Sequence, residues 1–264
     1  MERSFAGIVF LIAAVCVALA AGAWWMQRIV FTPEPTRSSA DAILDSPDIR
    51  LAINNQVTAA TAPILERDIT ELAAFVERDV LSTRAGAAMM APITEQAHER
   101  ILGQRTTPLR LSGPEMAEIV RDQRAADAEA VTIPVDRIAV IANFNAAIGW
   151  IVPIAGGLGL LLYAIGLALR PDGREIRTAI AEQLIALGVA MAVFGYLIPV
   201  HFITAIDDRT FSHAIPGLAL RTLPVVVITT VLCLIIGGLL LLTRPDDTRR
   251  RQPLSTSRYR GGWT

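Results

Sequence analysis

The densest group of possible metal ligands in this chain comprises His201, Asp207, Asp208 and His213, which lie in one short segment. Imidazole nitrogen and carboxylate oxygen are common ligands of divalent ions such as zinc. A metal-dependent envelope hydrolase is therefore one function that these residues allow. Their spacing matches no known metal motif, and the alternative is a loop in which His201 caps the preceding helix and an aspartate pairs with Arg209. Because histidine titrates near neutral pH, a pH-sensing role stays open.

His98 lies between Glu95 and Glu99 in a stretch that predicts a helix. It is a candidate general base or partner contact, but the neighbouring acids favour a histidine on the helix surface. No nucleotide-binding loop, catalytic motif or metal signature appears elsewhere in the sequence. We therefore predict that the chain is not an enzyme, needs no cofactor and binds no nucleic acid.

Glu182 is the one acidic residue inside a long apolar run. Ionisable residues within a membrane often mark a transport path. Glu182 is close to the end of its run, however, and the long side chain of Arg174 or Arg177 can reach it, so we expect an interfacial ion pair. The cores of the other three runs carry no charged residue, which argues against a transporter or a selective channel. An accessory component of a transport system remains an alternative function.

Four apolar runs, each long enough to cross a bilayer, dominate the sequence. Hydrophobic residues make up 53% of the chain, and its mean hydropathy is +0.47. About 20 apolar residues cross the ~30 Å of hydrocarbon in a bilayer. We therefore predict an all-α membrane protein with four transmembrane helices, at residues 5–27, 146–169, 178–200 and 223–243.

Tryptophans mark the expected membrane surface. Trp24, Trp25 and Trp150 fall at the ends of two apolar runs, where amphipathic indole rings favour the interface with water. The residues Ala21–Ala23 just before them resemble a signal-peptide cleavage site. The nearly uncharged start and the long apolar core of this first run favour an uncleaved anchor instead.

Arginines fix the predicted orientation. All 24 basic residues are arginine, a bias typical of GC-rich actinobacterial genomes. Short arginine-rich segments follow the predicted second and fourth spans, and their arginines include Arg170, Arg174, Arg177, Arg249, Arg250 and Arg251. By the positive-inside rule, residues 1–4, 170–177 and 244–264 are cytoplasmic, so both termini face the cytoplasm. Residues 28–145 and 201–222 then lie outside, and the stretch 29–147 holds 17 acidic residues against 11 arginines, a net charge of −6.

Residues 28–145 should form a small, mainly helical extracytoplasmic domain. Ser46-Pro47 predicts the start of a helix, and Pro63 predicts its end. The apolar stripe of residues 69–80 predicts a second helix over residues 64–81.

The second half of this domain carries its own boundary signals. A third helix is expected over residues 85–102, ending at Gly103. Ser112 and Glu115 form a capping box that opens a fourth helix, running to about residue 128. Residues 109–111 and 131–133 are short extended segments that could pair.

Small residues recur at four-residue spacing inside the apolar runs. This spacing lets helix backbones approach closely in lipid, where no hydrophobic force drives helices together. It predicts a packed bundle or self-association, and the residues concerned are Ala14, Ala18, Gly22, Ala155, Gly159, Gly188 and Ala192.

The predicted chain has one span, then an acidic helical domain, then three further spans. It also contains three short motifs, at residues 42–50, 97–103 and 109–112. In this combination the chain resembles a group of uncharacterised actinobacterial four-span integral membrane proteins with an extracytoplasmic helical domain. The resemblance covers most of the chain. The resemblance implies the fold and a plasma-membrane location. It offers no established activity and no catalytic residues to carry over to this chain.

Of the functions that remain, a non-enzymatic cell-envelope protein fits the sequence best. Such a protein would act as a scaffold, assembly factor or sensor through its outer domain. Its expected partners are membrane lipid and either another envelope protein or a second copy of the chain.

Overall fold

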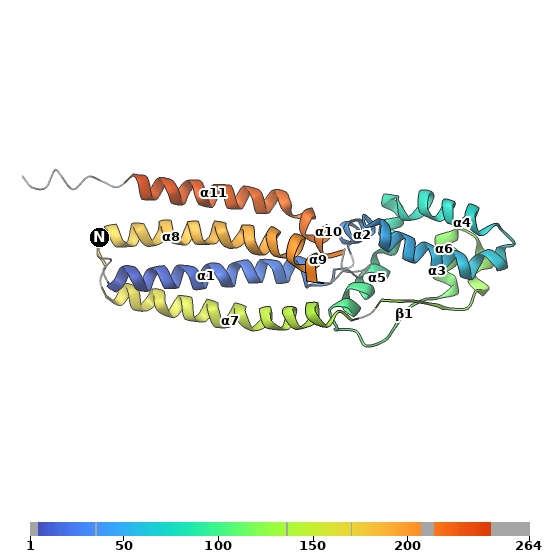
Figure 1. Ribbon diagram of the computed structural model, residues 1–264, viewed down its shortest axis with the longest axis horizontal. Helices are drawn as coiled ribbons and strands as arrows, with labels where there is room; N and C mark the ends of the chain where they lie inside the picture. The colour runs from blue at the N-terminus through green and yellow to red at the C-terminus, as the bar shows by residue number, and fades with distance from the viewer. Residues whose placement is uncertain (1–4, 35, 136, 170, 207–213, 244–264) are drawn as a thin grey trace, which may run out of the picture.

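A computed structural model describes residues 5–34, 36–135, 137–169, 171–206 and 214–243 of the chain. Long helices run side by side as a bundle, and a separate group of shorter helices stands at one end of it (Figure 1). We call this second part the head domain, residues 37–133. The predicted all-α class is confirmed, apart from one small strand pair in the head.

Four helices are long and apolar enough to cross a membrane, as predicted, which makes the chain a multi-pass membrane protein. The second begins earlier than residue 146, and the third changes from α-helix to π-helix partway along. Their bounds are α1 Phe5–Val30, α7 Ala139–Ala168, α8 Gly173–Ala192 continuing as η3 Val193–Phe202, and α11 Leu223–Leu242.

Helix α1 lies at the centre of the bundle, between α7 and α8, while α11 packs against α8 (Figure 1). Glycines allow these close approaches. A Cβ atom on Gly159 would meet Val17 at 2.6 Å, one on Gly22 would meet Phe194 at 2.8 Å, and Gly188 lies against Cys233. Three of the predicted small residues therefore do lie at helix contacts within the bundle.

The glycine contacts also fix the register of α7 against α1. Gly149 faces Gln27, Gly156 faces Ala20 and Gly166 faces Phe10, so the two helices are antiparallel. In this register the exposed side chains of Trp24 and Trp150 lie at the same level of the bundle. From Phe5 to this level α1 rises by about 30 Å, the thickness of bilayer hydrocarbon.

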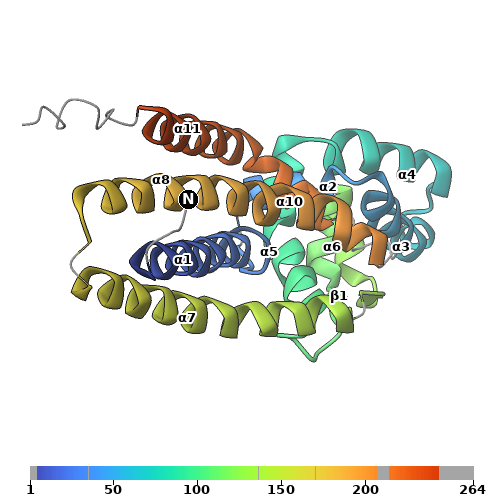
Figure 2. The same ribbon diagram turned by 60° about the vertical axis from the view of Figure 1, so that its left-hand side comes forward.

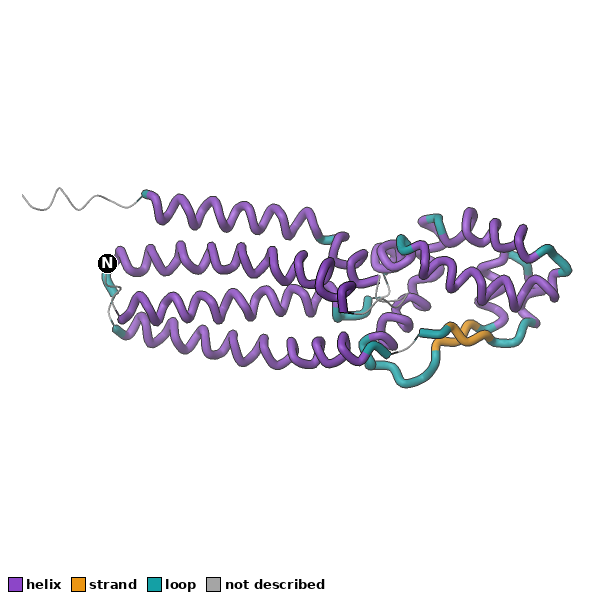
Figure 3. Tube along the Cα trace, viewed as in Figure 1, coloured by secondary structure: helices purple, strands orange, loops and turns teal. Residues whose placement is uncertain are grey.

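The head domain consists of short helices with one antiparallel strand pair, in which Leu109 pairs with Ile133 (Figure 3). The strand pair confirms that the two extended segments meet. The elements are α2 Arg37–Leu44, α3 Pro47–Leu65, α4 Ile69–Val76, π-helix η1 Glu77–Leu81, α5 Arg84–Ile101, β1 Leu109–Leu111, α6 Gly113–Val120, 3-10 helix η2 Gln123–Asp127 and β2 Val131–Ile133.

The predicted boundary at Pro63 is wrong. Helix α3 passes through Pro63 and ends at Leu65, where Glu66 takes the left-handed conformation (φ 53°). Proline lacks a backbone N–H, so Pro63 removes one hydrogen bond from α3. The helix continues because Pro63 lies in its last three residues, where the loss of one bond matters least. The next helix starts at Ile69 rather than Ile64, because the Asp68 carboxylate accepts the Thr70 and Glu71 N–H groups as an N-cap.

The signals in the second half of the head domain are largely confirmed. Helix α5 ends at Ile101, and Gly103 has a positive φ of 72°. The Glu115 carboxylate accepts both the Ser112 backbone N–H and its hydroxyl at 2.7 Å, which opens α6. Helix α6 is shorter than predicted, because Arg121 takes a left-handed conformation and turns the chain into η2.

The head and the bundle share one hydrophobic core. Buried residues at the head-side end of α1, such as Met26 and Val30, belong to the same cluster as Leu72 and Met116 of the head. Two helices, α9 Ile203–Ile206 and α10 Ala214–Arg221, also contribute to this core through Ile203 and Leu218. Figure 2 shows α10 beside α2 of the head. A continuous core therefore packs the head against the head-side ends of the membrane helices.

Candidate functional site: a polar groove between head and bundle

A groove of about 680 Å³ opens where the head meets the bundle. Its walls are α2, the start of α3, the turn between η1 and α5, and α10. Its charged side chains come from all four segments: Asp41, Asp45, Arg50, Arg84 and Arg221. The sequence placed none of these residues in a site, since they come from distant parts of the chain.

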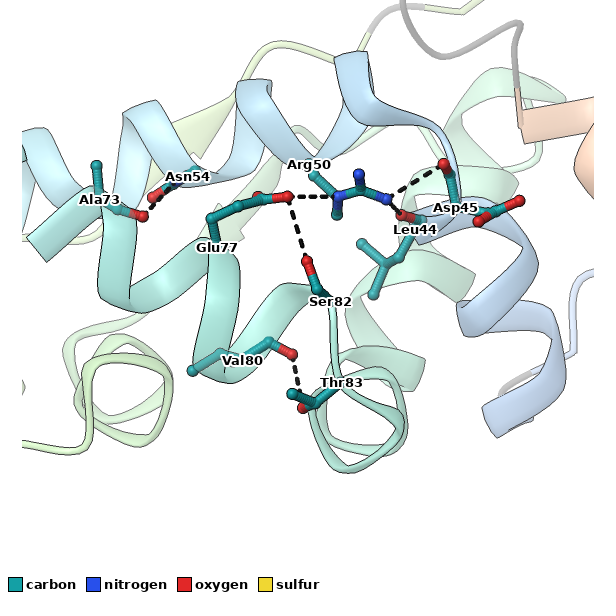
Figure 4. A network of polar contacts seen from close by, with 9 residues as sticks. All are labelled: Leu44, Asp45, Arg50, Asn54, Ala73, Glu77, Val80, Ser82 and Thr83. Carbon is teal, nitrogen blue, oxygen red and sulfur yellow. Dashed lines mark hydrogen bonds and ion pairs between the residues drawn. The ribbon is translucent and has the colours of Figure 1, made fainter.

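Arg50 braces one wall of the groove (Figure 4). Its Nε donates to a Glu77 carboxylate oxygen at 2.7 Å, and its Nη1 donates to the Leu44 and Asp45 carbonyls at 2.6 and 3.2 Å. The same Glu77 oxygen accepts the Ser82 hydroxyl at 3.3 Å. These hydrogen bonds join α2, α3 and η1. The Arg50 guanidinium therefore stabilises the wall of the groove and is not available to pair with a ligand.

Helix α10 closes the other side by a close crossing with α2. A Cβ on Gly217 would lie 2.3 Å from the Ala42 carbonyl oxygen, so glycine is required there. Arg221, at the end of α10, donates to the hydroxyls of Ser38 and Ser39 at 2.9 and 2.7 Å. The segment before the fourth span is therefore tied directly to the head.

Three charged groups of the groove remain available to a ligand. Within the described residues, the side chains of Asp41, Asp45 and Arg84 make no hydrogen bond or ion pair. Asp41 and Asp45 are four residues apart on or beside α2, so they share one face. The groove therefore offers two carboxylates and one guanidinium to solvent, which suits a ligand that carries both signs of charge.

His98 is buried, so the prediction of a surface histidine is wrong. It is 4% exposed, and its Nε2 lies 2.7 Å from the carbonyl oxygen of Val30, the last residue of α1. A carbonyl only accepts hydrogen bonds, so Nε2 carries the proton. Burial lowers the pKa of His98 to about 4, although the hydrogen bond to Val30 acts in the opposite direction. A neutral His98 therefore links the head to the end of the first span.

Of the four proposed metal ligands, only His201 lies in the described part of the chain. Asp207, Asp208 and His213 lie outside the described residues, and no group of three possible ligands occurs within them. His201 is exposed, and its ring contacts the Tyr196 ring edge-on with centroids 5.5 Å apart.

No protein-family model matches the chain, and neither a curated protein nor a solved structure is similar to it.

The remaining predicted positions lie along the bundle. Trp24 and Trp150 are exposed, whereas the indole N–H of Trp25 is buried and has no partner among the described residues. Arg177, at the end away from the head, donates to the Thr243 hydroxyl and so joins α8 to α11. Arg174 is exposed at the same end, whereas Arg170, Arg249, Arg250 and Arg251 lie outside the described residues. Glu182 is half-buried on α8, next to Gln183, whose side-chain oxygen accepts the Tyr163 hydroxyl at 2.7 Å.

Proposed function

We propose that this protein is a non-enzymatic cell-envelope protein that holds a partner-binding head against the outer face of the plasma membrane. In this proposal it acts as a scaffold or sensor, and the partner is a protein segment that carries both positive and negative charges. The observation that carries the proposal is the groove, where Asp41, Asp45 and Arg84 are unpaired within the described chain.

The coupling between groove and bundle supports a scaffold or sensor. Helix α10 leads directly into α11, and it forms one wall of the groove. A partner bound in the groove would therefore contact a segment continuous with a membrane helix. The central position of α1 in the bundle supports an uncleaved anchor, because removing it would expose the surfaces of α7 and α8 that pack on it.

The orientation in this proposal rests on the arginines. Arg174 and Arg177 lie near the start of α8, at the bundle end opposite the head, and α11 ends at Leu242 at that same end (Figure 1). In the sequence, the arginine-rich segment 244–264 comes directly after the described end of this helix. The positive-inside rule assigns that end to the cytoplasm and the head to the outside.

Site-specific photo-crosslinking in living cells tests the proposal. A photoreactive residue at Leu220, on the groove wall, should capture a protein partner, whereas one at Leu51 should not. The two positions are a matched pair, because Leu220 is 46% and Leu51 is 57% exposed, but Leu51 lies outside the groove. The capture at Leu220 should be lost when Arg84→Glu and Asp41→Arg reverse two of the three available charges. Equal capture at both positions, or capture that survives the charge reversal, would contradict the proposal.

A further inference from the structure

An apolar pocket of about 340 Å³ lies on the bundle, between the start of α7 and the end of the third span. All of its lining side chains are apolar. They are Val140, Ile141 and Phe144 of α7, Val193, Ile198 and Phe202 of η3, and Ile203 of α9. This pocket shares no lining residue with the polar groove.

The π-helix η3 builds one wall of this pocket. Val193, Ile198 and Ile203 recur at five-residue spacing. In an α-helix, residues five apart point about 140° away from each other, given 100° per residue. In a π-helix, where hydrogen bonds join residues five apart, they lie on one face. The change of helix type at Val193 therefore turns three apolar side chains toward α7.

The pocket begins at the membrane surface and extends beyond it. Val193 lies at about the level of Trp24, because its neighbour Phe194 contacts Gly22 of α1. On α7, Phe144 and Val140 are six and ten residues beyond Trp150, which places them about 9 and 15 Å outside the tryptophan level. An apolar pocket at this height faces headgroups and water rather than hydrocarbon, and leaving it wetted is unfavourable.

We propose that one hydrocarbon chain of a membrane lipid leaves the bilayer and occupies this pocket. The lower end of the pocket meets the hydrocarbon at the tryptophan level, so a chain enters without crossing water. The volume also suits a chain segment, since an apolar cavity of ~150 Å³ holds a benzene molecule and this one has about twice that volume. The inference is independent of the partner proposed for the polar groove.

Photo-crosslinking by a phospholipid with a diazirine at the end of one acyl chain tests this inference. The purified full-length protein is placed in vesicles of phosphatidylethanolamine and phosphatidylglycerol that contain the probe, and labelled peptides are identified by mass spectrometry. The expected result is labelling of residues 140–144 and 198–203, which the bulk hydrocarbon does not reach. Labelling confined to residues at or below the tryptophan level would overturn the inference.

Two pocket variants and one control complete the experiment. Val193→Phe fills the pocket, and Val140→Trp blocks it at an exposed position that leaves the core intact. Each should reduce labelling of residues 198–203 to background. Ile154→Trp, on an exposed part of α7 outside the pocket, should leave that labelling unchanged. Labelling that persists in both pocket variants would also overturn the inference.

Discussion

Replacing His98 by glutamine should remove a specific acid sensitivity from the protein. In the folded state His98 is neutral and buried, and its Nε2 donates to the Val30 carbonyl at 2.7 Å. Glutamine can place an amide N–H at a similar reach, and it never takes up a proton in this pH range. The His98→Gln variant thus keeps a hydrogen-bond donor for the Val30 carbonyl of α1, but its side chain no longer binds a proton as the pH falls.

The size and sign of the effect follow from the two pKa values of His98. Its pKa is about 4 in the folded protein, against 6.5 for an ordinary histidine. Well above pH 6.5 neither the folded nor the unfolded state is protonated at His98, and the full stability is present. Between these values only the unfolded chain binds the proton, so stability falls as the pH falls. At 1.36 kcal/mol per pKa unit, the loss approaches about 3 kcal/mol near pH 4.

Thermal unfolding of the purified protein in nanodiscs, followed by tryptophan fluorescence, measures this effect. Between about pH 7 and pH 4.5 the wild-type Tm should fall by roughly 5–10 °C more than that of the His98→Gln variant. His201→Gln, at an exposed histidine, should behave like the wild type. If the wild type and His98→Gln lose the same stability on acidification, then the buried, neutral state of His98 is refuted.

Two further substitutions test the contacts that hold the walls of the groove together. Gly217→Val should lower the free energy of unfolding by about 1–3 kcal/mol, because its side chain would clash with Ala42, whereas Gly157→Val, with open space around it, should cost much less in the same unfolding assay. Arg50→Ala should also cost about 1–3 kcal/mol, because two backbone carbonyls and Glu77 lose their donor. Arg78→Ala, at an exposed arginine, should change the Tm little, and equal losses in both arginine variants would refute the bracing role of Arg50.

The membrane helices could be predicted from sequence because each depends on one continuous apolar run. The position of His98 was predicted wrongly, since the adjacent Glu95 and Glu99 were given more weight than the spacing of Thr94, His98 and Ile101. Those three residues recur at i, i+4 and i+7, and all are buried on one face of α5. The spacing held the correct signal.

The π-helix and the groove were beyond sequence reasoning for a physical reason. The five-residue spacing of Val193 and Ile198 gains meaning only once α7 packs opposite them. The groove joins α2, the turn before α5 and α10, which are brought together by contacts such as Gly217 with Ala42. Nothing local in any of these segments predicts its neighbours in the others.

Accessibility of single cysteines in intact cells tests the placement of the head most directly. Leu51→Cys puts a thiol on the exposed surface of the head, and Gly173→Cys puts one at the opposite end of the bundle. The parent chain, with its native Cys16 and Cys233, supplies the background. A membrane-impermeant thiol reagent should label Leu51→Cys in intact cells and Gly173→Cys only after permeabilisation. The reverse pattern would place the head in the cytoplasm and contradict the proposed function.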